Sequence, residues 1–154
     1  MSEWAHTDRL SELVRRKRAC LESLSCLGRE QLALVERGEM GELLRLLASK
    51  QRLLADLEGI EKSLAPYRDE RPQERVWRGE TERGACALEL VRCERLLADI
   101  VAQEKESEKN LRLRRDEAAV RLEAAHFATR ARGAYQAGAA SEARQLDLSS
   151  DIQS

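Results

Sequence analysis

Apolar residues that recur at alternating spacings of three and four constrain the fold of this chain more than any other feature. The first such row covers Leu10, Leu13, Lys17, Cys20, Leu24, Leu27, Gln31 and Leu34. This heptad rhythm predicts a long helix that begins at Thr7 or Asp8, either of which could cap it. A second row at period seven, made of Val14, Leu21, Gly28 and Val35, widens the apolar stripe. We therefore expect this helix to contact more than one neighbour.

A second helix follows after a short interruption. Gly38 and Gly41 follow the end of the first pattern. Glycine after the last periodic residue commonly ends a helix. The rhythm then resumes through Met40, Leu43, Leu47, Lys50, Leu54, Leu57, Glu61 and Leu64, flanked by Leu46, Leu53 and Ile60. Because the connection is so short, the two helices should be antiparallel neighbours.

The periodicity is lost from Ala65 to Arg83, which contains both prolines of the chain. Pro66 disfavours a helical conformation at Ala65, so we expect a linker here, with Thr81 as the cap of a third helix. That helix has no Pro or Gly between Gly84 and Gly133. Its roughly 50 residues would extend about 75 Å, against about 45 Å for the first helix. It must therefore overhang, bend or break. We expect the break at the polar run Glu104–Asn110, which puts Glu104 and Ser107 on the apolar row of Cys86, Leu90, Cys93, Leu97 and Ile100.

Composition supports a helical fold, because Ala, Leu, Glu, Lys and Arg account for 93 of the 154 residues. Strand-forming residues are scarce, which argues against a sandwich or a parallel sheet. The sequence thus predicts an all-α fold: an antiparallel bundle of three long helices over residues 1–137. The small, polar residues 138–154 should form a disordered tail.

Metal and catalytic sites are not predicted. Two Glu-x-x-His pairs, Glu3/His6 and Glu123/His126, have the spacing used by di-iron bundles, but the first precedes the periodic region and cannot reach mid-depth. We find no catalytic triad elbow, phosphate-binding glycine loop or nucleotide motif, so we expect no enzyme activity and no cofactor. The cysteines Cys20, Cys26, Cys86 and Cys93 lack zinc spacing and are expected to be reduced, mostly core residues.

Net charge limits the classes of partner that the chain can bind, and hydropathy indicates its cellular location. The net charge is −1, so no overall field favours nucleic acid. The basic runs Arg15–Arg18 and Arg112–Arg115 are expected to be solvated, because neighbouring acidic residues can pair with them. No export signal or membrane-spanning run is evident, so we expect a cytoplasmic protein without membrane insertion.

The segment from Ala118 to Ala143 holds 11 of the 21 alanines. Its apolar residues form two stripes: Ala118, Leu122 and Ala125 on one, and Val120, Ala124, Phe127, Ala131 and Tyr135 on the other. A helix with two apolar faces needs two partners. One partner can be the parent bundle, and the other a second copy of the chain or an amphipathic helix of a client. The alternative is an Ala-rich helix that its own bundle covers completely.

The stretch from Gly38 to Leu64 resembles the flagellar export chaperone FlgN family and its FliT-type relatives. Leu46-Leu47, Lys50-Gln51, Leu53-Leu54 and Leu57 match the leucine-rich run of the second helix in that family. The order of elements also agrees over most of the chain: long helix, turn, helix, charged linker, long third helix, small polar tail.

The resemblance implies a chaperone that holds terminal helices of hook-associated proteins and delivers them to the type III export gate. Tyr135 lies roughly where the family places a tyrosine linked to the export apparatus. We expect clients to bind the C-terminal third of the chain, at Leu111, Ala118, Val120, Leu122, Ala124, Phe127, Ala131 and Tyr135. The competing hypothesis is a structural coiled coil or adaptor that acts by self-association, as a homodimer that buries the same segment.

Overall fold

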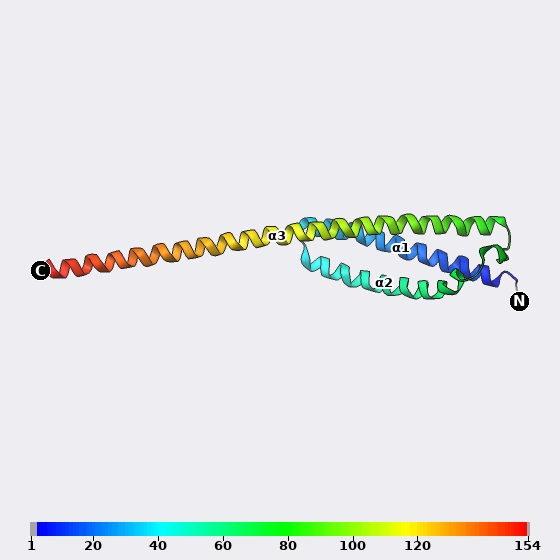
Figure 1. Cartoon of the computed structure of the whole chain (residues 1–154), viewed down its shortest axis with the longest axis horizontal. Helices are drawn as coiled ribbons and strands as arrows, with labels where there is room; N and C mark the ends of the chain where they lie inside the picture. The colour runs from blue at the N-terminus through cyan, green and yellow to red at the C-terminus, as the bar shows by residue number, and fades with distance from the viewer. Residues whose placement is uncertain (1–2, 154) are drawn as a thin grey trace. The chain divides into compact units, whose positions relative to one another are not determined.

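The computed structural model describes the backbone of residues 3–153 and the side chains of residues 3–138. In this part the chain forms α1 (Ala5–Arg37), α2 (Met40–Arg68), the short 3-10 helix η1 (Pro72–Glu74) and α3 (Glu80–Gln153) (Figure 1). The described residues contain no strand, which confirms the predicted all-α fold with three long helices.

Residue contacts divide the chain into two units, Met1–Leu111 and Arg112–Ser154, which are described separately. The first unit holds α1, α2 and the beginning of α3. The predicted tail over 138–154 lies, apart from Gly138, outside the residues whose side chains are described, and its disorder stays a prediction.

The turn between α1 and α2 forms as the sequence predicts. Gly38 ends α1 with a positive φ of 70°, a conformation that costs glycine little. Its N–H donates to the carbonyl of Val35 at 3.2 Å, and the N–H of Glu39 donates to the carbonyl of Leu34 at 3.0 Å. This pair of bonds is a Schellman motif, which satisfies carbonyls at the helix end. The chain reverses here, and α1 and α2 run antiparallel (Figure 1).

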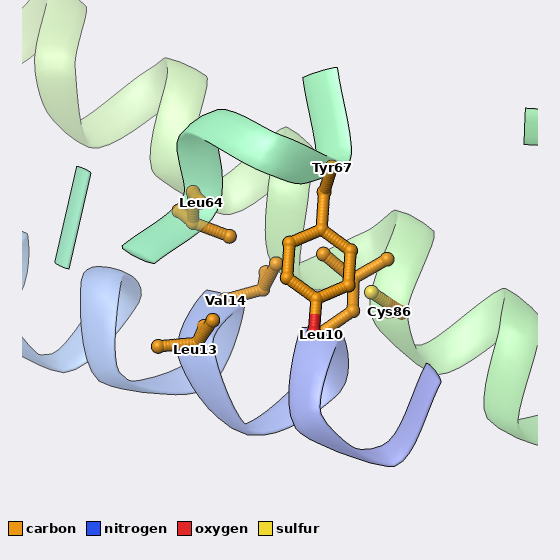
Figure 2. Packing of buried hydrophobic residues seen from close by; sticks show 6 residues of the cluster. All are labelled: Leu10, Leu13, Val14, Leu64, Tyr67 and Cys86. Atoms are coloured by element: carbon orange, nitrogen blue, oxygen red, sulfur yellow. The ribbon is translucent and has the colours of Figure 1, made fainter. Parts of the chain in front are cut away.

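In the first unit, α1 packs against both α2 and α3. Three apolar clusters follow one another along it. The first joins the start of α1 to the end of α2 and the start of α3 through Leu10, Leu13, Val14, Leu64, Tyr67 and Cys86 (Figure 2). The second contains Cys20, Leu21, Leu24 and Cys93, and the third, beside the turn, contains Leu34, Val35, Leu43 and Leu46. The predicted second row of α1 is buried throughout, which confirms that this helix has more than one neighbour.

The buried faces of α2 and α3 differ in part from the predicted rows. Leu47 and Leu54 of α2 are exposed, as are Leu90 and Leu97 of α3. Instead, α2 turns Leu46, Leu53 and Ile60 inward, and α3 turns Leu96 inward. Leucines are adjacent at 46/47 and 53/54 in α2 and at 96/97 in α3, so spacing alone does not decide which member of each pair faces α1. The later member of each pair lies at the surface.

The predicted helix ends are wrong at three places. α2 continues through Pro66 to Arg68, because Tyr67 in its last turn is buried in the first cluster and Pro66 removes only one hydrogen bond there. Thr7 lies inside α1, and its hydroxyl donates a hydrogen bond of 2.7 Å to the carbonyl of Val76. Thr81 lies inside α3, whose first turn is closed by a bond from the Arg83 N–H to the carbonyl of Gly79.

The predicted break at Glu104–Asn110 is also wrong, because α3 continues through this stretch. Its Ser107 is only 1% exposed, and it belongs to a buried polar layer between the second and third clusters. Gln31 Nε2 donates to Ser107 Oγ at 2.7 Å, and Lys50 Nζ donates to Gln31 Oε1 at 2.9 Å. Lys50 also pairs with Glu104. A polar run on the inward face therefore marks polar partners on α1 and α2, and the helix stays packed.

Candidate functional site

The predicted client-binding residues lie on α3, and all of them are exposed. Leu111 is the last residue of the first unit, and the others belong to the second unit. The largest of them are far from covered: Leu122 is 60% exposed, Val120 66%, Phe127 70% and Tyr135 80%. Ala118, Ala124 and Ala131 are exposed as well. Among the described residues of the second unit, none covers these side chains.

These residues form two stripes along the helix of the second unit. Val120, Ala124, Phe127 and Ala131 follow one another at spacings of four, three and four, which is the rhythm of a coiled-coil seam. Leu113, which is not among the predicted residues, is half exposed and extends this stripe. Its position seven residues before Val120 is the signal that could have identified it. On another face, Ala118 and Leu122 continue the line of Leu111.

The flanks of the stripes are charged and predominantly basic. Residues 112–138 contain six arginines and three acidic residues. Arg115 lies 3.6 Å from Asp116, and the Thr129 hydroxyl donates to the carbonyl of Ala125 within the helix. The segment thus offers apolar contact area with a positive border, and an amphipathic helix with an acidic border would complement it.

His6, one of the residues considered for metal binding, has other partners in the structure. His6 Nε2 lies 2.7 Å from Glu70 Oε2, and its ring stacks on Tyr67 with centroids 4.5 Å apart. Hydrogen bonds from Arg75 and His6 hold the pKa of Glu70 below its usual value. Among the residues that the structure describes, no group of three or more His, Cys, Asp or Glu side chains is arranged to hold a metal ion.

The structure also places the cysteines and the first basic run, Arg15–Arg18. Cys20, Cys86 and Cys93 are buried in the core as predicted, and burial raises the pKa of each thiol. Cys26 is exposed. Lys17 lies 2.7 Å from Glu61 of α2, and Arg18 lies 2.6 Å from Glu89 of α3. Arg15 and Arg16 are exposed. The run therefore points in several directions and forms no single basic patch.

The described helices include none with the length and apolar character needed to cross a membrane. Three comparisons with known proteins were made: with protein-family models, with curated proteins and with solved structures. None of them yields a match to this chain.

Proposed function

We propose that this protein is a cytoplasmic chaperone of flagellar type III export. It would bind terminal helices of hook-associated proteins, keep them unassembled and deliver them to the export gate. The observation that supports the proposal is the exposure of the two apolar stripes of α3, between Leu111 and Tyr135. The leucine-rich resemblance of α2 to the FlgN family, described above, supplies the choice of clients.

The proposed binding mode is helix against helix. A client helix that polymerises in the flagellum has an apolar face that must be kept from its assembly partners. Laying that face along Val120, Ala124 and Phe127 would remove apolar surface from water on both sides. Fully burying a side chain the size of Phe is worth about 1.5–3 kcal/mol, so a few such contacts suffice for reversible binding. The chaperone could then release its client at the gate.

The experiment is a pull-down of hook-associated proteins with Leu122→Asp, Phe127→Asp and a chain truncated after Asn110. Each variant is first checked for retained helicity by circular dichroism. We expect all three to lose the client, because an unpaired charge in an apolar interface costs several kcal/mol. Arg16→Gln is the control: it changes the net charge by the same −1 at an exposed position of α1, and it should bind like the parent. If folded Phe127→Asp and Leu122→Asp retain clients, the binding site lies elsewhere.

The exposed stripes favour one alternative, a scaffold that acts by self-association. The rhythm of Val120, Ala124, Phe127 and Ala131 is also suited to pairing with a second copy. Sedimentation equilibrium separates the two hypotheses. A tight dimer that Phe127→Asp splits, in a protein that captures no hook-associated protein, would favour the scaffold.

A further inference from the structure

A cavity of about 310 Å³ lies in the first unit, away from the stripes of α3. It is found where the start of α1, the end of α2 and the start of α3 converge. Its apolar lining includes almost fully buried side chains of the first cluster, among them Leu10, Val14, Leu64 and Cys86, and the more exposed Trp77, Ala87 and Leu90. Figure 2 shows these side chains approaching one another from the three helices, with the ring of Tyr67 between them. The volume is at the small end of the range for ligand pockets.

The polar groups around the cavity are almost all cationic. Its lining includes Lys17, Arg68, Arg75 and Arg83, and it includes no Asp or Glu. The cavity therefore combines two features of a site that binds amphiphilic anions: an apolar lining and positive charge at its rim.

The carboxylates next to the rim leave part of this charge uncompensated. Lys17 Nζ lies 2.7 Å from Glu61, and Arg68 pairs with the same carboxylate. Two cations thus share one anion. Arg75 is held in place by Glu70 at 2.6 Å and by the carbonyl of Tyr67 at 2.7 Å. Arg83 has only a long contact of 4.0 Å with Glu80. One further negative charge at Lys17 and Arg68 would balance the pair.

We propose that this cavity binds an apolar monocarboxylate of the medium-chain fatty acid class. The hydrocarbon chain lies against Trp77, Ala87 and Leu90, and the carboxylate lies at the rim beside Lys17 and Arg68. The small apolar volume disfavours a hydrated or multiply charged anion, and the cationic rim disfavours an amine. The inference does not depend on the proposed export function, since none of these residues belongs to the stripes of α3.

Trp77 makes the binding measurable, because it is one of two tryptophans and lines the cavity. In a Trp4→Phe background its fluorescence is titrated with decanoate, kept below the micellar range. We expect a saturable change with one site per chain. Decyltrimethylammonium, which has the same chain length and the opposite charge, should bind at least 10-fold more weakly, as should decanol. Equal affinity for the three probes would overturn the proposal, since it would indicate adsorption without charge recognition.

Two variants test the location. Ala87 lines the cavity from an exposed position of α3, so Ala87→Phe should fill the cavity without entering the core. Arg68→Gln removes one of the two cations at Glu61. Each should weaken decanoate binding at least 10-fold and leave the circular dichroism spectrum unchanged. Arg71→Gln is the control, because Arg71 is an exposed arginine that does not line the cavity. Decanoate binding of parental strength in folded Ala87→Phe and Arg68→Gln would refute the site.

Discussion

Gln31 of α1 donates a 2.7 Å hydrogen bond to Ser107 of α3, and both side chains are buried. The other end of the Gln31 amide accepts a bond from Lys50 of α2, so one side chain joins all three helices. Burial lowers the pKa of Lys50, which reflects the cost of keeping a charged amine inside the bundle. The side chains of the polar layer thus satisfy one another's hydrogen bonds.

Ser107→Ala should lower the free energy of unfolding by about 1–3 kcal/mol, because it leaves the Gln31 amide buried without its acceptor. Urea denaturation measures the change. Ser49→Ala on the exposed face of α2 is the control and should change stability by less than about 0.5 kcal/mol. Replacing the layer as a whole, with Gln31→Leu, Lys50→Met and Ser107→Ala together, should recover or exceed the parental stability. A single Ser107→Ala that matches the parent would show that the layer is dispensable.

Gly28 of α1 and Gln103 of α3 should show strong energetic coupling. A Cβ on Gly28 would collide with the Gln103 Oε1, so the amide must move and lose its 3.1 Å bond to the Ser25 carbonyl. Alanine in a helix is favoured over glycine by about 1 kcal/mol. In a Gln103→Ala background, Gly28→Ala should therefore stabilise by about that amount, whereas in the parent the gain should disappear. A double-mutant cycle measures the difference. Equal effects in both backgrounds would contradict the close approach.

Glu70 should contribute stability that depends on pH. Its pKa is lower in the folded protein than in the unfolded chain, where it is about 4.3. The contribution is therefore complete above that value and is lost as the pH falls through the lower folded value. Thermal melts of the parent and Glu70→Gln should differ at neutral pH and converge in acid. A difference that persists at the lowest pH would assign the effect to the shape of the side chain instead of its charge.

The four thiols should differ in reactivity. Cys26 is exposed, whereas Cys20, Cys86 and Cys93 are buried and have raised pKa values. Because the thiolate is the reactive form, a thiol reagent should label one site quickly and three slowly in the native protein. All four should react quickly in denaturant. Cys26→Ser should remove the fast phase, and a fast phase that survives this change would mean that a core cysteine is accessible.

The sequence predicts where the helices lie along the chain better than it predicts which face of each helix is buried. The rows of α1 are recovered because this helix is buried on a wide stripe that takes in most positions of both rows. Leu47 and Leu97 show why α2 and α3 are harder: each has an apolar neighbour one position earlier, and only the packing against α1 selects between them.

The polar layer and the cavity cannot be predicted from residue spacing, for a different reason. Gln31 and Lys50 fall on predicted seam positions, but a polar residue on a seam signals a partner only when the facing residues are known. Ser107 lies 76 residues after Gln31 in the sequence. The exposed stripes between Leu111 and Tyr135 could be predicted, since alanine-rich apolar spacing is visible locally.

The position of α1 between two later helices affects how the chain can fold as it is synthesised. Its contacts with α3 connect residues that are far apart in sequence: Val14 receives a contact from Cys93 across 79 residues. The hairpin of α1 and α2 can form early, but one apolar face of α1 then stays open until α3 has left the ribosome. Loop closure over such a separation is slow compared with a hairpin. Until α3 is synthesised, the α1 surface that Cys86 and Cys93 contact in the folded protein lacks these partners, and apolar surface left open in this way favours aggregation.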